Sequence, residues 1–213
     1  MEPGTIQPVI LYDPDTQHGY AEANEIVPYF ASSIIKIEKW YASELDKDFK
    51  QANPILTLPA TDSYLYRSNP LEALAQVAER AGWPNRGNSF MPYVYLALLP
   101  GHGGFAGSVH HSDYRTNSFQ AGLCALGDAC IEAIMGNATA CQTILGGWPS
   151  EFCSVDGQTG AIAHELMHGL GWGEHTETSG LDLSTDEYSR FPDCHLPQII
   201  KDWMLSNPRN IFF

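Results

Sequence analysis

The chain has 213 residues, of which 44% are hydrophobic, and its formal net charge is −14 at pH 7. This length and composition fit one globular domain with a substantial core, and no apolar run approaches the ~20 residues of a membrane-spanning helix. The negative charge excludes nucleic acid and anionic membrane surfaces as partners, because both bind basic protein surfaces.

The N-terminal half of the sequence is predicted to alternate strands with helices. Strands are expected where short apolar runs are bounded by turn residues, and the most continuous of these runs, at 92–99, predicts a strand buried on both faces. Helices are expected where apolar residues recur at steps of three and four. The predicted order is a strand at 8–12, a helix at 20–45, a strand at 54–59, a helix at 70–82 and a strand at 92–99.

The C-terminal half is predicted to be more irregular. Residues 105–111 are expected to add a strand at the edge of the sheet. Residues 112–158, which are rich in Gly, Asn, Ser and Cys, are expected to form loops with a short helix near 125–135. The remaining prediction is a helix at 159–170, polar loops at 176–197 and a short closing helix or turn at 197–204.

Four of the five cysteines, Cys124, Cys130, Cys141 and Cys153, lie close together, and the fifth is Cys194. Their spacing is not a CxxC metal-binding pattern. We therefore expect one or two disulfides, one odd thiol among the five, and a secreted protein in an oxidising compartment. The N-terminus does not read as a signal peptide and fits a mature form from which one has been removed. The alternative is a cytosolic protein with buried thiols.

A His-Glu-x-x-His motif runs from His164 to His168. Residues four apart share one face of a helix, so the two histidines can bind one metal ion, and Zn²⁺ favours such nitrogen ligands. Glu165 lies beside His164, where a general base can accept a proton from a metal-bound water. The flanking residues are apolar, and a buried Glu between two His is costly unless something pairs with them.

The predicted helix ends soon after the motif, because Gly169, Gly171 and Gly173 follow it. Gly171 can adopt the left-handed conformation that ends a helix, and the chain would then bring a third ligand back to the metal. We predict His175 as that ligand, because imidazole is a frequent zinc ligand with a long reach. Glu174 is the alternative.

The stretch from Gly160 to Trp172 resembles the zinc helix of the metzincin metallopeptidases, and its amino-acid sequence is most similar to that of the astacin branch. The metzincin pattern is His-Glu-x-x-His-x-x-Gly-x-x-His, or Asp in the last place, and it matches here through Gly171. The last place falls on Glu174, with His175 one residue later. The resemblance implies one zincin-like α/β (α+β) catalytic domain over 1–213. It would have a mixed twisted sheet, two packing helices and an active-site helix, with an upper lobe over 5–171 and a small irregular lower part over 172–213.

The resemblance also implies a substrate-binding edge and a methionine turn. In metzincins an edge strand pairs with extended substrate, and the candidate here is Gly104–His111. Metzincins carry a methionine in a tight turn beneath the metal, and Met204 is the only methionine after the motif. Ser206 stands where astacins have a tyrosine two residues further on, which leaves Tyr188 as a candidate for that role.

We interpret the sequence as a secreted, monomeric zinc endopeptidase with one catalytic Zn²⁺ and a peptide or protein substrate. His164, His168 and His175 would bind the metal, and Glu165 would pass a proton from water to the leaving amine. Two alternatives stay open. A thermolysin-like site would use Glu187, or less plausibly Asp182, as third ligand, whereas an inactive, zinc-stabilised binding module would have no chemical need for Glu165.

Overall fold

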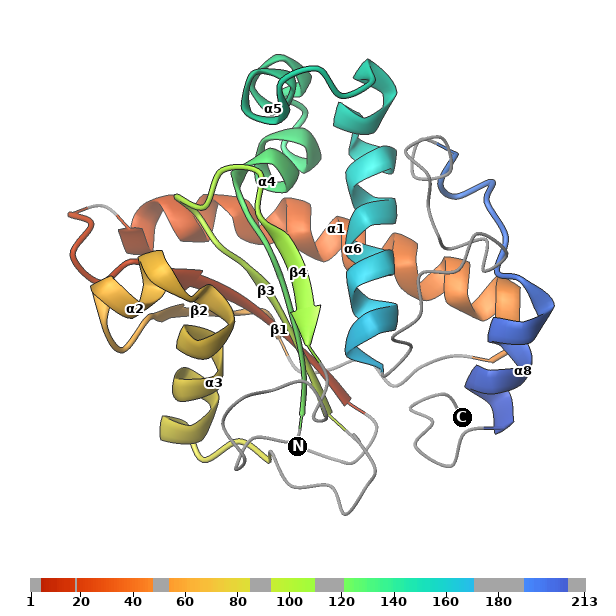
Figure 1. Ribbon diagram of the computed structural model, residues 1–213, viewed down its shortest axis with the longest axis horizontal. Coiled ribbons are helices and arrows are strands. Elements are labelled where there is room, and N and C mark those ends of the chain that lie inside the picture. Colours follow the sequence, from red (N-terminus) through yellow and green to blue (C-terminus); the bar gives the residue numbers. More distant parts are fainter. Residues whose placement is uncertain are drawn as a thin grey trace.

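Five strands form one mixed sheet at the centre of the protein (Figure 1). This computed structural model describes residues 5–17, 19–47, 54–84, 93–109, 121–170 and 190–206. In their order across the sheet the strands are β2 (Leu56–Pro59), β1 (Thr5–Tyr12), β3 (Tyr93–Leu98), β5 (Gly122–Leu126) and β4 (Ala106–Val109). The first four run parallel, whereas β4 pairs antiparallel with β5 at one edge.

Helices cover both faces of this sheet, so the fold belongs to the α/β class (Figure 1). The helices are α1 (Gly19–Leu45), α2 (Ser63–Ser68), α3 (Pro70–Arg80), α4 (Asp128–Ile134), α5 (Ala138–Leu145), the 3-10 helix η1 (Ser150–Cys153), α6 (Val155–Gly169) and α8 (Gln198–Ser206). The predicted helices at 20–45 and 70–82 are confirmed as α1 and α3.

Alternate residues of the central strands contribute to two separate cores, because successive side chains of a strand point to opposite faces. Ile10 and Leu96 lie in one core with residues of α1, α4 and α6. Val9 and Tyr95 lie in the other core with residues of α3. All six residues of β3 are buried, which confirms the prediction of a strand covered on both faces.

The expectation of loops over 112–158 is wrong for most of the described part of that range. Residues 122–126 form the buried strand β5, and α5 and η1 follow the helix α4 that the sequence predicts near 125–135. The disulfide Cys141–Cys153 joins α5 to η1, which confirms a bridge in this cysteine-rich segment. Cys124, Cys130 and Cys194 remain thiols, so three are left rather than one.

The C-terminal segment is attached to the end of α1 around Glu44. One carboxylate oxygen of Glu44 accepts a hydrogen bond from His195 Nδ1 at 2.8 Å. The other accepts the backbone N–H of Leu196 at 2.8 Å and lies 2.9 Å from Lys201 Nζ. Trp40 Nε1 donates to the carbonyl oxygen of Cys194 at 2.9 Å. These contacts hold residues 194–201 against α1.

None of the helices in the described ranges is sufficiently long and apolar to cross a membrane.

Candidate metal site

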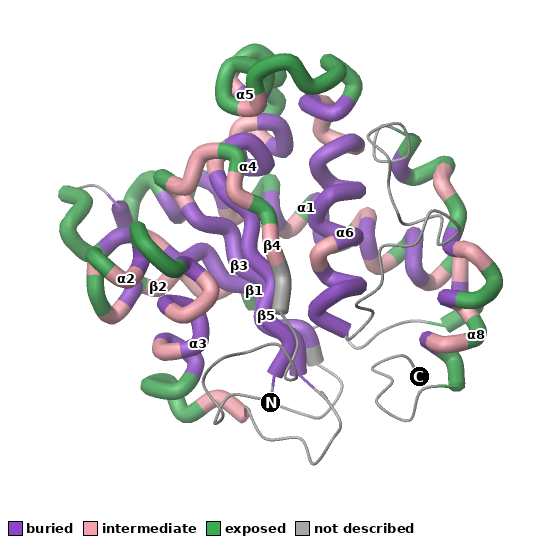
Figure 2. Tube along the Cα trace, in the orientation of Figure 1, coloured by how far each residue is buried: buried purple, intermediate pink, exposed green. Residues whose placement is uncertain are grey.

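Helix α6 carries the His-Glu-x-x-His motif and begins four residues before its predicted start. Ser154 caps the helix, because its hydroxyl oxygen accepts the backbone N–H of Gly157 at 2.9 Å. The helix ends at Gly169, and the N–H of Leu170 still bonds to the carbonyl oxygen of Leu166 at 2.9 Å. Figure 2 shows α6 buried along most of its length. An interior helix therefore presents the motif.

His164 and His168 point their Nε2 atoms at each other. The two nitrogens lie 2.9 Å apart, and the rings are nearly perpendicular with centroids 4.4 Å apart. Both side chains are buried, at 4% and 9% exposure. Two zinc–nitrogen bonds at a tetrahedral angle would place the nitrogens ~3.4 Å apart. A small rotation of either ring would reach that separation, so the pair fits a zinc ion.

Glu165 is the one residue between Gly157 and Leu170 that is not buried; it is half-buried. Its neighbours on the helix are buried, so solvent reaches this part of α6 at Glu165. A carboxylate at such a border can accept a proton and still exchange with solvent. The role of Glu165 as a general base stays a prediction.

The end of α6 lies directly on strand β5. A Cβ built on Gly169 would lie 2.2 Å from Cys124 Sγ, and one built on Gly122 would lie 1.9 Å from the carbonyl oxygen of Gly169. The thiol of Cys124 donates to the carbonyl oxygen of Glu165 at 3.0 Å. Burial, followed by the nearby charge of Glu165, raises the pKa of Cys124 and keeps it a neutral donor.

Helix α1 holds α6 from a second direction. The Tyr41 hydroxyl donates to the carbonyl oxygen of Ala163 at 3.0 Å, directly before His164. The Ser33 and Thr159 hydroxyls are 3.1 Å apart and hydrogen-bonded. Burial raises the pKa of Tyr41 well above its usual value, so it stays protonated. Side chains from α1 and β5 thus bond to the carbonyls on either side of His164.

The predicted third ligands lie outside the described residues. His175, Glu174, Glu187 and Asp182 all belong to the range 171–189, as does Tyr188. Within the described ranges, no group of three His, Cys, Asp or Glu side chains could hold a metal ion. The structure therefore brings together two of the three predicted ligands and leaves the third a prediction.

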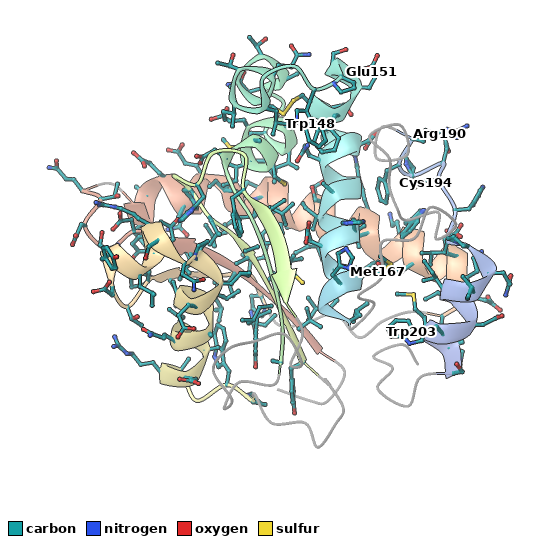
Figure 3. All side chains as sticks on the ribbon, in the orientation of Figure 1. Trp148, Glu151, Met167, Arg190, Cys194 and Trp203 are labelled. Atoms are coloured by element: carbon teal, nitrogen blue, oxygen red, sulfur yellow. A yellow bond between two sulfur atoms is a disulfide. The ribbon has the colours of Figure 1, made fainter. Side chains whose placement is uncertain are left out.

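Met204 lies on a helix rather than in the tight turn that the metzincin resemblance implies, and this helix confirms the closing helix that the sequence predicts near 197–204. The helix is α8, and 2% of the Met204 surface is exposed. Met204 belongs to the same core as Leu166 and Met167 of α6. In Figure 3 its neighbour Trp203 extends from α8 toward the side on which α6 and Met167 lie. Met204 is therefore a buried core residue on a helix.

No protein-family model matches the sequence, and no curated protein matches it significantly. Among solved structures, the fold is similar to the crystal structure of wild-type OgpA from Akkermansia muciniphila, with a TM-score of 0.51 and 13% sequence identity. The similarity covers 92% of this chain and 58% of OgpA, so the chain spans somewhat over half the length of that protein. At this identity the similarity concerns the fold alone.

Sequence reasoning missed three residues that position the motif: Tyr41, Gly122 and Cys124. Tyr41 lies within the helix predicted at 20–45, but the helical pattern does not indicate its bond to α6. The signal for Gly122 is its place at the start of an apolar run, where a glycine weakens a strand unless another backbone approaches closely.

Proposed function

We propose that the protein is a zinc-dependent endopeptidase of the metzincin type. The observation that carries the proposal is the pair of buried imidazoles, His164 and His168, whose Nε2 atoms converge to 2.9 Å beside the half-buried Glu165. Convergent imidazole nitrogens are ligands that Zn²⁺ favours, and a carboxylate beside them can act as a general base.

The proposed chemistry divides between the metal and the chain. His164, His168 and a third ligand would hold a zinc ion, which would supply a Lewis acid for the scissile carbonyl and for water. Glu165 accepts the proton of the attacking water and delivers it to the amine of the leaving peptide. The hydrogen bonds that Tyr41 and Cys124 donate to backbone carbonyl oxygens of α6 hold the helix that carries the metal ligands and the general base.

The edge strand β4 supports a peptide as the substrate. It is the last strand in the sheet order, so within the described ranges its outer edge has no strand partner. Strand β4 contacts α6, and Figure 1 shows the two side by side. An extended peptide could add to this edge through main-chain hydrogen bonds and lie across the histidine pair.

We also propose that the protein is secreted. The disulfide Cys141–Cys153 supports an oxidising compartment, since such bonds persist outside the cytosol. Mass spectrometry after alkylation of the unfolded chain should count three reactive thiols without reductant and five with it. Five thiols without reductant would contradict the bridge.

The test of the proposed function combines metal analysis with cleavage of an unfolded protein. We expect one bound zinc per chain, and we expect a chelator to abolish cleavage and added zinc to restore it. His164→Ala should lose both the metal and the activity, whereas His195→Ala, at an exposed position outside α6, should keep both. Full activity in metal-free protein would overturn the proposal. Bound zinc without cleavage of any unfolded substrate would favour the inactive binding module.

A further inference from the structure

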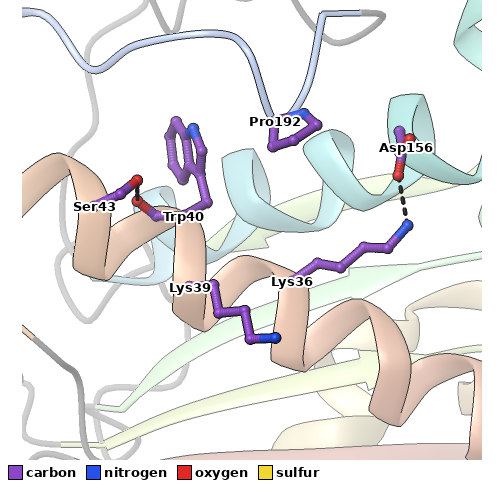
Figure 4. A pocket seen from close by; sticks show the side chains of 6 residues that line it. All are labelled: Lys36, Lys39, Trp40, Ser43, Asp156 and Pro192. Atoms are coloured by element: carbon purple, nitrogen blue, oxygen red, sulfur yellow. Dashed lines mark hydrogen bonds and ion pairs between the residues drawn. The ribbon is translucent and has the colours of Figure 1, made fainter.

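A pocket of about 370 Å³ lies between helix α1, the start of α6 and Pro192 (Figure 4). Four of its lining residues, Lys36, Lys39, Trp40 and Ser43, follow the i, i+3, i+4, i+7 spacing that places side chains on one face of a helix. Asp156 and Pro192 form its other walls. Its volume is at the small end of the ~300–1,000 Å³ of ligand sites.

The pocket carries an excess positive charge on a strongly negative protein. Lys36 Nζ lies 2.6 Å from Asp156 Oδ1, so these two charges largely compensate each other. Lys39 is exposed, and within the described part of the chain it makes no ion pair. Two of the eleven basic residues of a chain with a net charge of −14 therefore meet at one pocket, and of these two only Lys36 has an ion-pair partner among the residues that the structure describes.

The apolar wall of the pocket is held in place by packing and hydrogen bonds, and 3% of the Trp40 surface is exposed. The indole of Trp40 is fixed at Nε1 by the carbonyl oxygen of Cys194, and its ring packs against Phe191 at a centroid distance of 5.5 Å. The hydroxyl of Ser43 donates to the carbonyl oxygen of Trp40 at 2.8 Å. Among the polar groups of the lining, the ammonium of Lys39 thus stays available to a ligand.

We propose that this pocket binds a small organic carboxylate whose apolar or aromatic body lies against Trp40 and Pro192 and whose charge is held by Lys39. A planar apolar body suits a fixed indole and a proline ring, and an ammonium on a flexible stem suits a carboxylate as a point charge. The ligand is either a free acid or the C-terminal residue of a peptide, which present the same chemistry.

The site is separate from the histidine pair and does not depend on the proposed function. Asp156 precedes His164 by eight residues of α6, which is ~12 Å along the helix axis. In Figure 1, α6 lies between strand β4 and the segment from 190 that supplies Pro192. A peptide added to β4 would therefore lie on the other side of the helix.

Asp156 acts as a built-in competitor in this arrangement. Its carboxylate already bonds to Lys36, as a ligand carboxylate would. Removing the charge of Asp156 should release the Lys36 ammonium to the pocket. Asp156→Asn is therefore expected to tighten binding, whereas loss of Lys39 weakens it, and these opposite signs distinguish a site from a general surface effect.

The experiment is a titration of the full chain, labelled with 5-fluorotryptophan, followed by ¹⁹F NMR. The Trp40 resonance, assigned with Trp40→Phe, should shift with phenylacetate and not with neutral phenylacetamide. Lys39→Gln should weaken phenylacetate binding about 3- to 5-fold and Asp156→Asn should strengthen it by a similar factor, the size of an exposed ion pair. Lys47→Gln, at an exposed position outside the pocket, should leave the affinity unchanged.

A second titration identifies the source of the carboxylate. A peptide that ends in a free phenylalanine and its C-terminal amide are compared with phenylacetate. If the free peptide binds and the amide does not, the ligand is a peptide terminus; if only phenylacetate binds, it is a free acid. An unshifted Trp40 resonance with both phenylacetate and the free peptide, equal binding of phenylacetamide, or an unchanged affinity in Lys39→Gln would overturn the proposal.

Discussion

The backbones of Gly122 and Gly169 meet without a side chain between them. A Cβ on Gly122 would lie 1.9 Å from the carbonyl oxygen of Gly169, far inside van der Waals contact. Gly122 begins strand β5, and Gly169 ends helix α6 one residue after His168. This backbone contact therefore sets the distance between the sheet and the end of α6 that carries the histidine pair.

Gly122→Ala should destabilise the protein and displace the end of α6. The clash is with backbone, which cannot rotate away, so we expect a loss of about 1–3 kcal/mol in the free energy of unfolding, the usual cost of overpacking. Urea denaturation measures it. Gly104→Ala is the control, because its Cβ would meet only side-chain atoms, Leu145 Cδ2 at 3.1 Å and Ile144 Cγ2 at 3.9 Å. Equal stability of the two variants would show that the backbones of Gly122 and Gly169 leave room for a methyl group.

Glu165→Gln should abolish cleavage and leave folding intact. Glutamine keeps the size of the side chain but cannot accept the proton, and loss of a general base costs at least ~10²-fold in rate. Zinc content and melting temperature should stay close to those of the parent. Glu151→Gln, an exposed change in η1, serves as the control for charge. Activity within a few-fold of the parent would assign the base to another residue.

The ion pair and hydrogen bonds of Glu44 should make the free energy of unfolding fall at acidic pH. Burial alone would raise the pKa of Glu44, but hydrogen bonds from His195, Lys201 and the Leu196 N–H, together with the charge of Lys201, lower it. The unfolded state therefore binds more protons. The stabilisation is complete above the unfolded value of 4.5 and is lost as the pH falls through the lower folded-state pKa.

The measurement is denaturation between about pH 6 and about pH 3, where acid titrates this group. Glu44→Gln should cost roughly 1–2 kcal/mol near neutral pH, where it weakens charged hydrogen bonds, and should flatten the loss of stability in acid. Glu22→Gln, at an exposed position on α1, should keep the slope of the parent. If the Glu44 and Glu22 variants have parallel acid profiles, the C-terminal segment is held by other contacts.

The fold could be predicted where periodicity is strong. Helix α1 and strand β3 agree with their predictions within one residue, because a long amphipathic pattern and a continuous apolar run have few alternatives. Strand β5 was missed because its five residues, Gly-Leu-Cys-Ala-Leu, are short and have no period. Its glycine also argues against a strand, and the need for that glycine arises only from α6, a distant segment of the sequence.

In the candidate site, too, the features set by local sequence could be predicted, and those set by contacts between distant segments could not. Residues four apart on one helix must share a face, so the convergence of His164 and His168 follows from local geometry. The supports from Tyr41 and Cys124 are contacts between distant segments, and no local pattern encodes them. The third ligand follows the helix end, where the path of the chain depends on turn conformations rather than on periodicity.

The last prediction concerns that third ligand, which we assign to His175. Glu174 fills the place where metzincins have His or Asp, but a neutral imidazole is a frequent zinc ligand and reaches further from its Cα than a carboxylate. Gly171 and Gly173 flank Trp172 and can absorb a delay of one residue. With three imidazoles on the metal, the fourth position is open to water, as catalytic zinc requires.

Separate His175→Ala and Glu174→Ala variants distinguish the two assignments through zinc retention during dialysis against a graded chelator. The His175 variant should lose the metal as completely as His164→Ala does, because each removes one of three protein ligands. The Glu174 variant should retain it with an affinity lowered by no more than about 10- to 100-fold, the effect of a residue that only orients a ligand. The reverse order of the two variants would assign the site to Glu174 and leave His175 to contact solvent or substrate.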